Sequence, residues 1–205
     1  VVSTIVVFGS ARVREGNPWY EAARTFGRIA SERGGALRDG EAGRHHVIAT
    51  GGGPGIMEAA NRGATEAGAI SIGFNITLPH EQEPNAWSTP DLTFLFHYFA
   101  MRKMHLAMRA SALVVFPGGF GTLDELFEIM TLVQTGKMGP VPIVLYDSGY
   151  WKGLLNLERM AEAGFIRPDD LKLFAYADSP EEAYDRIAEG AGDGWNQPKN
   201  GSVQT

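Results

Sequence analysis

Short apolar runs that end at glycine turns, each followed by an amphipathic stretch, recur along the chain. Thr4–Phe8 (TIVVF) runs into Gly9 and Ser10, and Ala112–Phe116 (ALVVF) runs into Pro117–Glu125 (PGGFGTLDE). Continuous apolar runs of this length are typical of parallel strands buried on both faces, and the amphipathic stretches have helical spacing. The alternation predicts an α/β fold, a Rossmann-like doubly wound parallel sheet flanked by helices.

The same patterns predict the order of the elements. We expect strands at residues 4–8, 46–50, 69–74, 92–96, 112–116, 141–146 and 171–176, and helices at residues 18–33, 56–67, 98–109, 123–134 and 151–163. Ser179–Glu182 (SPEE) has the pattern of a capping box with proline at the first helical position, and it predicts the start of a last helix. Residues 75–91 show no period and predict a long loop, a feature that is often functional.

Length and composition indicate one globular domain. With 205 residues, of which 44% are hydrophobic and 20% charged, the chain can build a single core. We expect one Rossmann-like domain over residues 1–190. Residues 191–205 are polar and rich in glycine, so they predict a flexible C-terminal tail.

Composition also disfavours several classes of function. The formal net charge of −6 argues against a nucleic-acid partner, because such binding depends on Lys and Arg that neutralise phosphates. The chain has no cysteine and its five histidines show no metal-ligand spacing, so we expect no metal site. No apolar run approaches the roughly 18 residues of a membrane helix, and the first residues lack the basic start of a secretory signal. We expect a soluble cytoplasmic protein without a membrane partner.

Pro117–Glu125 predicts a phosphate site. Gly118, Gly119 and Gly121 allow the backbone to approach a ligand closely. A helix is expected to start near Thr122, and the free N–H groups and positive dipole end of such a start stabilise an anion. The carboxylate of Glu125 follows directly, which indicates chemistry on a phosphorylated substrate.

Glu125 has a second interpretation. Thr122–Glu125 reads T-x-x-E, the pattern of a capping box in which the glutamate binds a backbone N–H group at the helix start. The spacing alone does not decide between a cap and a catalyst. Asp124 fits a solvated acid in the first turn of the helix.

A second glycine turn, Gly51–Gly55 (GGGPG), follows the strand predicted at residues 46–50. Ligands of doubly wound sheets bind beyond the carboxyl ends of the strands, and Gly9 and Ser10 belong to the same edge. Neither glycine run is a Walker A loop, since no Lys-Ser/Thr pair follows. The turns therefore indicate a ligand site at this edge, with purely structural turns as the alternative.

The helix predicted at residues 98–109 combines positive and apolar side chains. Arg102, Lys103 and Arg109 place charge on it, which fits either an anion contact or an ordinary solvated face. Aromatic and methionine side chains crowd the same region and indicate core or a subunit contact; they are Phe94, Phe96, Tyr98, Phe99, Met101, Met104 and Met108.

The motifs resemble a known family. Pro117–Glu125 is similar to the PGGxGTxxE signature of the LONELY GUY (LOG) proteins, and Arg102-Lys103 is similar to its companion R-K pair. Residues 51–61 resemble the family's GGGxxGxM-type segment, and residues 7–10 its first strand and turn. The resemblance extends over residues 4–190. Residues 77–85, together with residues 97–101, resemble a longer bacterial-type subgroup more than the short cytokinin-activating members.

The resemblance implies a hydrolase of N-glycosyl bonds, a nucleoside 5′-monophosphate phosphoribohydrolase. Such an enzyme splits AMP or a cytokinin riboside monophosphate into free base and ribose 5-phosphate. Members often carry the label lysine decarboxylase, which we discount because that chemistry needs pyridoxal phosphate on a lysine. We expect no cofactor.

The resemblance also implies roles for residues. Arg102 and Glu125 would be catalytic: Arg102 would assist departure of the base, and Glu125 would hold the ribose hydroxyls or activate water. The substrate-binding residues would be Gly9, Ser10, Gly52, Gly53, Lys103, Gly118, Gly119, Gly121 and Thr122. Family members form dimers, so we expect a homodimer that shares its active site. The alternative is a non-catalytic nucleotide or molybdenum-cofactor carrier, a class that resembles LOG proteins.

Overall fold

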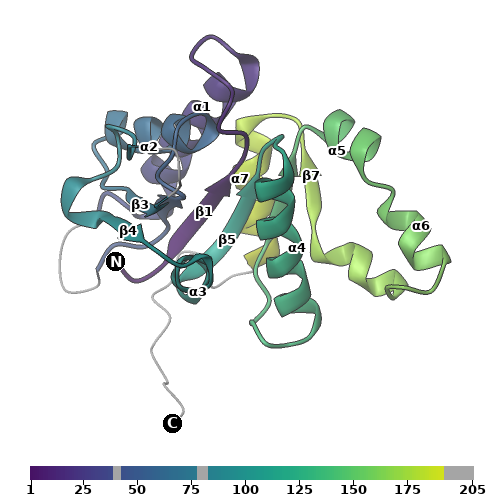
Figure 1. The fold of residues 1–205 in the computed structure, drawn as a ribbon. Helices are drawn as coiled ribbons and strands as arrows, with labels where there is room; N and C mark the ends of the chain where they lie inside the picture. Colours follow the sequence, from purple (N-terminus) through teal and green to yellow (C-terminus); the bar gives the residue numbers. More distant parts are fainter. Residues whose placement is uncertain (39–42, 78–82, 192–205) are drawn as a thin grey trace.

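A parallel sheet forms the centre of the fold in the computed structural model, which describes residues 1–38, 43–77 and 83–191. Its strands are β1 (Thr4–Phe8), β2 (Val47–Thr50), β3 (Ile72–Ile76), β4 (Thr93–Phe96), β5 (Ala110–Val115), β6 (Ile143–Tyr146) and β7 (Ala175–Ala177). They lie in the order β4-β3-β2-β1-β5-β6-β7, and every neighbouring pair is parallel (Figure 1). The order reverses between β1 and β5. The predicted doubly wound α/β fold is therefore confirmed.

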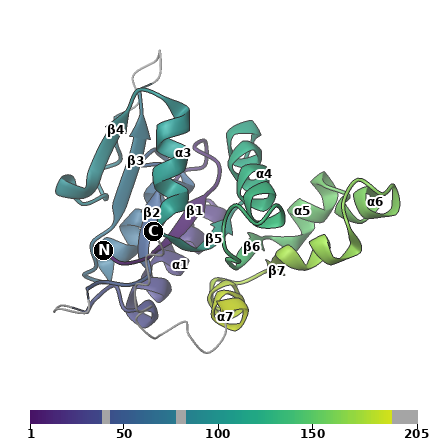
Figure 2. The same cartoon turned by 90° about the horizontal axis from the view of Figure 1, so that it is seen from below.

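Helices cover both faces of the sheet. They are α1 (Pro18–Gly34), α2 (Ile56–Glu66), α3 (Phe99–Met108), α4 (Phe120–Gln134), α5 (Ser148–Leu154), α6 (Leu157–Glu162) and α7 (Pro180–Ala191), with 3₁₀ turns η1 (Pro90–Leu92) and η2 (Pro168–Leu173). Helix α1 contacts both α2 and α7 on one face, and α3 and α4 lie on the other (Figure 2). This arrangement follows from right-handed crossovers, because the chain steps outward from β1 in opposite directions on the two sides. Within the described ranges, no helix is both long and apolar enough to cross a membrane.

The central strands are buried throughout. Every residue of β1, β2, β3 and β6 is buried, as continuous apolar runs predict. Strand β4 differs: it lies at the edge of the sheet, and Phe94 and Leu95 remain exposed. Phe96 packs against the core, but Phe94 and Leu95 are left largely open to solvent.

Two predicted elements after β6 are wrong. The helix expected at residues 151–163 is split into α5 and α6, because Leu155 is extended and the side chain of Asn156 caps α6 by accepting from Arg159 N at 2.9 Å. The strand expected at residues 171–176 is mostly the 3₁₀ turn η2, and β7 follows it. The local caps outweigh the apolar pattern in both places.

Other boundaries carry smaller corrections. The Ser179 hydroxyl caps α7 by accepting from Glu182 N at 3.1 Å, but the Glu182 carboxylate accepts from Asp178 N instead of closing the predicted box. The loop expected at residues 75–91 begins later, because Asn75 and Ile76 belong to β3, and residues 78–82 lie outside the described residues. Ala191 still belongs to α7, and the rest of the predicted tail lies outside the described residues.

Glycines permit the close crossing of α1 and α2. A Cβ atom added at Gly63 would overlap Arg24 O and lie 2.8 Å from Arg28 N, and one added at Gly27 would overlap Ala60 O. Only hydrogen on the Cα atom allows the two backbones to approach this far. The crossing holds α2, and with it the second glycine turn, against the β1–β2 half of the sheet.

We predict that Gly63→Ala lowers the free energy of unfolding by about 1–3 kcal/mol, because the methyl group forces the helices apart. Urea denaturation followed by circular dichroism measures the change. Gly153→Ala is the matched control: nothing lies within 4 Å of its added Cβ. In α5 that alanine should stabilise by about 0.5–1 kcal/mol. Equal effects of the two substitutions would contradict the close crossing.

Candidate active site

A cavity of about 680 Å³ opens where the strand order reverses, at the carboxyl ends of β1 and β5. We call it the switch-point cavity. The loop after β1, residues 9–12, forms one wall, and residues 118–125 at the start of α4 form the opposite wall. Arg102 from α3 and Tyr150 from α5 complete the lining. Six predicted substrate-binding residues meet here: Gly9, Ser10, Gly118, Gly119, Gly121 and Thr122.

The start of α4 offers unpaired amides to this cavity. The helix begins at Phe120 with Gly119 at the N-cap position, and no side chain caps it. No acceptor in the described part of the chain receives the N–H groups of residues 119–122, and the space around Gly119 and Gly121 is open. A helix start with free donors and a positive dipole end favours an anion.

Gly118 lies in a fixed position under these amides. The Tyr150 hydroxyl donates to Gly118 O at 2.7 Å, and Ser10 N donates to Pro117 O at 2.9 Å. A Cβ atom at Gly118 would overlap the Thr122 hydroxyl, so the position requires glycine. The two hydrogen bonds occupy both carbonyl oxygens and fix the backbone before α4.

Tyr150 is itself held by a carboxylate. Asp147 accepts from Tyr150 N at 2.9 Å and from Trp19 Nε1 at 2.8 Å. Asp147 has a φ of 72°, a left-handed conformation that costs energy for a residue other than glycine. Sequence reasoning missed Tyr150, although an aspartate directly after a buried strand is a signal for a helix cap.

Glu125 is a buried carboxyl group without a partner. It is 7% exposed, lines the switch-point cavity, and accepts no hydrogen bond within the described residues. Because α4 begins at Phe120, Glu125 is the sixth residue of the helix, so the predicted T-x-x-E capping box is wrong. Burial raises the pKa of Glu125, and the charges of Arg102 and Lys103 act in the opposite direction.

Arg102 points inward from α3. Its Nε donates to Phe74 O at 2.7 Å, and a Cβ atom at Gly51 would overlap its guanidinium. Burial lowers the pKa of Arg102, while the nearby charge of Glu125 raises it. A solvated face is therefore the wrong interpretation for Arg102. Arg109 lies apart, with its guanidinium donating to Val1 O at 2.9 Å.

Lys103 joins α3 to α4 instead of lining the cavity. Its Nζ lies 2.6 Å from Asp124 Oδ2 and 2.8 Å from Glu128 Oε2. Burial lowers the pKa of Lys103, but the hydrogen bonds with Asp124 and Glu128 outweigh this effect and leave the pKa above its ordinary value. The structure therefore gives Lys103 a structural contact where we predicted a substrate contact. Asp124 is a solvated acid in the first turns of α4, as predicted, and it also pairs with Lys103.

Gly52 and Gly53 are buried outside the cavity. Gly52 O accepts from Asn85 N at 2.8 Å, Gly53 O accepts from Asn85 Nδ2 at 3.0 Å, and Gly52 N donates to Thr50 Oγ1 at 2.9 Å. The second glycine turn thus anchors the segment around Asn85. Its contribution to the cavity comes from Gly51, which leaves room for Arg102, and from Met57 in α2.

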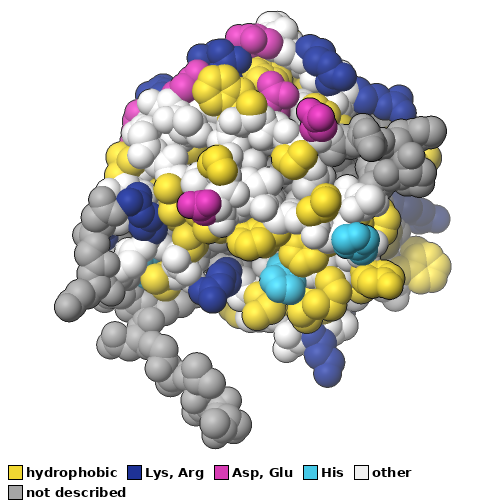
Figure 3. Space-filling model, turned by 60° about the vertical axis from the view of Figure 1, so that its left-hand side comes forward, with side chains coloured by type: hydrophobic (Ala, Val, Ile, Leu, Met, Phe, Trp, Pro, Cys, Tyr) yellow, Lys and Arg dark blue, Asp and Glu magenta, His cyan; other side chains and the backbone are white. Residues whose placement is uncertain are grey.

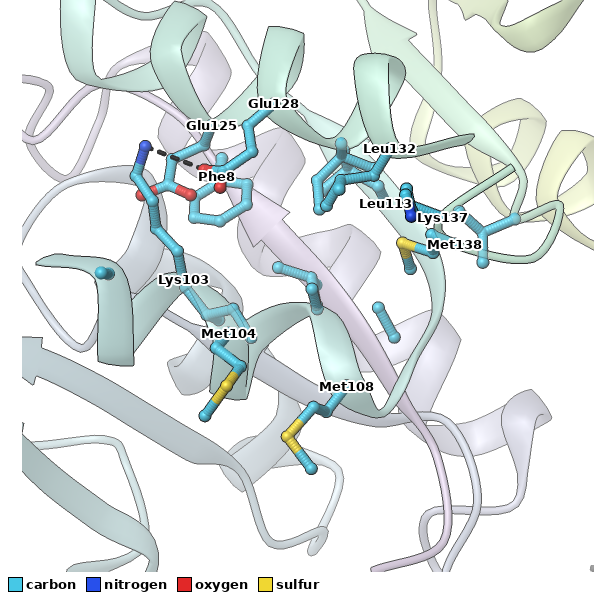
Figure 4. Close-up of a pocket in the computed structure, with 17 residues that line it drawn as sticks. Phe8, Lys103, Met104, Met108, Leu113, Glu125, Glu128, Leu132, Lys137 and Met138 are labelled. Carbon is cyan, nitrogen blue, oxygen red and sulfur yellow. Dashed lines mark ion pairs between the residues drawn. The ribbon is translucent and has the colours of Figure 1, made fainter. Parts of the chain in front are cut away.

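A second, mostly apolar cavity of about 480 Å³ lies between α3 and α4, over β1 and β5. Figure 4 shows Glu125 and Glu128 beside Lys103 at one end, and Lys137 and Met138 at the other. Glu125 lines both cavities. Glu125 therefore stands where the two cavities meet.

The residues present do not fit a Schiff-base cofactor or a metal. The basic side chains that line the switch-point cavity are Arg12 and Arg102, neither of which forms an imine. Within the described ranges, no group of three or more His, Cys, Asp or Glu residues could hold a metal ion. The lining instead combines free backbone donors, which favour an anion, with the carboxyl group of Glu125.

Comparison with known proteins places this site in a family. A family model described as "possible lysine decarboxylase" matches residues 57–187. The chain belongs to this family. A probable cytokinin riboside 5′-monophosphate phosphoribohydrolase of Oryza sativa subsp. japonica is 29% identical over 193 residues, which is 93% of this chain and 78% of that protein. The predicted resemblance to LOG proteins is confirmed.

Other LOG relatives match over shorter stretches. A second probable phosphoribohydrolase of this name from Oryza sativa subsp. japonica is 34% identical over 89 residues, which is 43% of this chain and 36% of the relative. A third from the same organism matches over 90 residues and 42% of its own length. The chain thus spans less than half of these two relatives.

Solved structures share the fold of this LOG family chain. The molybdenum cofactor binding protein of Rippkaea orientalis is 22% identical, with a TM-score of 0.60 over 91% of this chain and 96% of that one. The molybdenum cofactor carrier protein of Chlamydomonas reinhardtii is 21% identical, with a TM-score of 0.61 over 91% and 96%. At such identities the likeness shows the fold alone.

We predict that Glu125→Gln gains stability relative to the wild type as the pH rises above 4.5, the ordinary pKa of this carboxyl group. A group whose pKa is raised by folding contributes stability at low pH and loses it as the pH rises, whereas glutamine does not titrate. Urea unfolding of both proteins between about pH 2 and 8 measures the difference, and the range also covers the Asp170→Asn control.

Asp170→Asn is a control for which the change of stability with pH is expected to have the opposite sign. Hydrogen bonds from Arg167 and Gln134 lower the pKa of Asp170 to about 2. Its contribution is therefore present above the ordinary pKa of 3.8 and is lost as the pH falls from there toward about 2. A difference between the wild type and Glu125→Gln that stays constant with pH would contradict the assigned burial of the carboxylate.

Proposed function

We propose that the protein is a nucleoside 5′-monophosphate phosphoribohydrolase that releases the free base and ribose 5-phosphate. One observation carries the proposal: the buried, unpartnered carboxyl group of Glu125 faces the same cavity as the unpaired amides of α4. An anion site beside an acid that accepts no hydrogen bond suits a phosphorylated sugar that develops positive charge.

The 5′-phosphate binds at the start of α4. The N–H groups of residues 119–122 surround an anion, and the Thr122 hydroxyl lies among them. Phosphate binding is remote from the bond that breaks, so its free energy can hold the ribose in position for the reaction. Gly9 and Ser10 form the facing wall.

Glu125 acts on the ribose. Cleavage of a ribosyl C–N bond passes through an oxocarbenium-like cation, and a carboxylate beside C1′ stabilises that charge. The raised pKa of Glu125 also suits a group that takes a proton from the attacking water. Water adds its hydroxyl to C1′, the C1′–N bond breaks, and the base leaves with the remaining proton.

Arg102 assists the departing base. Its guanidinium is held by Phe74 O and lies within the electrostatic reach of Glu125. A cation that donates hydrogen bonds to the base stabilises the electrons that the broken bond leaves there. Arg102 is thus the counterpart of Glu125 on the leaving-group side.

The base lies beside Arg102 in the switch-point cavity, and the apolar cavity beyond Glu125 accepts an apolar substituent on the base. This apolar cavity is lined by Met104, Met108 and Met138, whose flexible side chains adapt to different shapes. Both adenine and an adenine with an apolar substituent suit this arrangement, which supports AMP or a cytokinin riboside monophosphate as substrate. We further propose that the protein acts in the cytoplasm without a cofactor, a nucleic acid or a membrane partner.

We predict that the purified protein releases adenine and ribose 5-phosphate from AMP, and that Glu125→Ala lowers kcat by about a hundredfold or more because the stabilising charge is lost. Chromatographic detection of the base measures both. Glu162→Gln on α6 removes a carboxylate far from the cavity and should leave the rate unchanged.

The same assay tests the carrier alternative. The fold that this chain shares with molybdenum cofactor carriers gives that alternative its support. Tight binding of a nucleotide or of molybdenum cofactor without base release would favour a carrier. Undiminished release by Glu125→Ala would contradict the role of this residue.

We propose a homodimer that covers the apolar face of β4 and α3. The aromatic and methionine side chains predicted there as core or contact are largely exposed; Phe94, Leu95, Tyr98, Phe99, Met101, Met104 and Met108 are the exposed ones. Figure 3 shows hydrophobic side chains gathered on one face, with the β4 side toward the viewer. Phe99 of α3 lies on this surface and also lines the switch-point cavity, so a second copy would reach the site.

We predict that Leu95→Glu converts the dimer to monomer, with at least about a hundredfold weaker association, because the contact would bury an unpaired charge. Analytical ultracentrifugation measures the change. Phe165→Glu is the matched control, since Phe165 is 81% exposed but lies between α6 and η2. A wild-type protein that sediments as a monomer would contradict the proposed contact.

A further inference from the structure

The loop that follows β1 carries a cation that the signature motifs do not include. Arg12 is exposed and lines the switch-point cavity, opposite the first residues of α4. Its guanidinium makes no ion pair or hydrogen bond within the described residues. Lys103, in contrast, is bound by two carboxylates, and Arg102 is bound by Phe74 O.

Local hydrogen bonds fix the backbone of this loop, and the side chain of Arg12 takes part in none of them. Ser10 Oγ accepts from Arg12 N at 3.1 Å, and the Arg14 guanidinium donates to Ala11 O at 2.8 Å and Val13 O at 3.0 Å. Arg14 therefore serves the loop itself. Arg12 is the arginine of this loop that faces the cavity.

The loop is also fixed relative to α4 and α2. Ser10 N donates to Pro117 O at 2.9 Å, and Ile56 N donates to Ser10 O at 3.0 Å. Gly55, with a φ of 72°, lies so close that a Cβ atom there would overlap Ser10 O. The Arg12 backbone is thus held at a constant place across from the open amides.

The positive charges described so far do not balance the charge of a bound phosphate monoester. A helix start supplies about half of an elementary charge, while a phosphate monoester carries roughly −1.5 to −2 near neutral pH. Arg102 is engaged next to Glu125, and Asp124 is neutralised by Lys103. Glu125 is 7% exposed, and its negative charge offsets the positive charge of Arg102. A dianion there needs a further full positive charge.

We propose that Arg12 supplies this charge by binding the 5′-phosphate from the side opposite α4, and that it makes the protein select nucleoside monophosphates over nucleosides. The proposal rests on the proposed function and names the residue that sets its substrate class. A guanidinium forms two parallel charge-assisted hydrogen bonds to phosphate oxygens, which a neutral wall does not. The contact is made at an exposed position, so added salt weakens it.

Arg12→Gln is the test, with two readouts. Isothermal titration with ribose 5-phosphate measures binding without turnover, and AMP hydrolysis gives KM and kcat separately. We expect the Kd for ribose 5-phosphate and the KM for AMP to rise about tenfold to a hundredfold, the range of a lost charge-assisted hydrogen bond. We expect kcat to change less than about threefold, because a contact that binds substrate and transition state equally affects KM and not kcat. Any slow hydrolysis of adenosine should be unaffected, because adenosine has no phosphate.

Matched variants separate charge from structure. Arg12→Lys keeps the charge and should recover part of the affinity, although it loses the planar fork. Arg28→Gln removes an arginine from the exposed face of α1, where it pairs with Glu32, and should bind ribose 5-phosphate as the wild type does. Thermal unfolding of Arg12→Gln should match the wild type, because its side chain supports no part of the described fold.

The outcomes distinguish the two proposals. If the wild type hydrolyses AMP and Arg12→Gln retains its Kd and KM, the role of Arg12 is refuted and the phosphoribohydrolase stands. If the wild type binds ribose 5-phosphate without hydrolysing any nucleotide, the reaction is refuted, and the change in Kd alone decides the role of Arg12. If the wild type does not bind ribose 5-phosphate, the phosphate site and the role of Arg12 both fall.

Discussion

The pairing of β1 with β5 is the constraint on which the site depends. The two strands run in register from Ile5 opposite Ala112 to Phe8 opposite Val115. The pairing continues past the strand ends, since Phe116 N donates to Phe8 O at 2.8 Å and Ser10 N to Pro117 O at 2.9 Å. Two glycine turns that are more than a hundred residues apart in the sequence thereby become the two walls of one cavity.

This pairing also explains why the two walls differ in chemistry. The β5 turn leads directly into α4 and therefore presents backbone donors, whereas the β1 turn continues as a loop before α1 and presents side chains. The sheet reverses its order between them, so the helices that follow leave on opposite faces and do not fill the space. In the proposed complex, an anion would meet amides on one side and Arg12 on the other.

The sequence predicted the elements that are buried on both faces. β1, β2 and β6 are continuous apolar runs, and their positions depend on little besides burial. The split between α5 and α6 was not predictable from periodicity, because one extended residue, Leu155, and one cap, Asn156, decide it. Such single-residue choices leave hardly any trace in an apolar pattern.

The site was predicted to a similar extent. The PGGFGTLDE motif located the α4 amides and Glu125, but the motif could not show that the helix begins at Phe120 and removes the capping role of Glu125. The R-K pair likewise did not show that its two side chains have different contacts. Neighbouring helix positions face different directions, so Arg102 points inward and Lys103 points to α4. Tyr150 and Arg12 lie outside any motif, and only the fold brings them to the cavity.

The exposed edge of strand β4 affects how prone a single chain is to aggregate. It ends the sheet with the sequence TFLF, which contains no charge and no proline, and it leaves one row of backbone groups unpaired with any other described strand. Natural proteins protect such edge strands, because an open edge pairs with strands of other chains and so promotes aggregation. If the proposed homodimer covers this strand, a long-lived assembly formed soon after folding would protect it better than a reversible encounter.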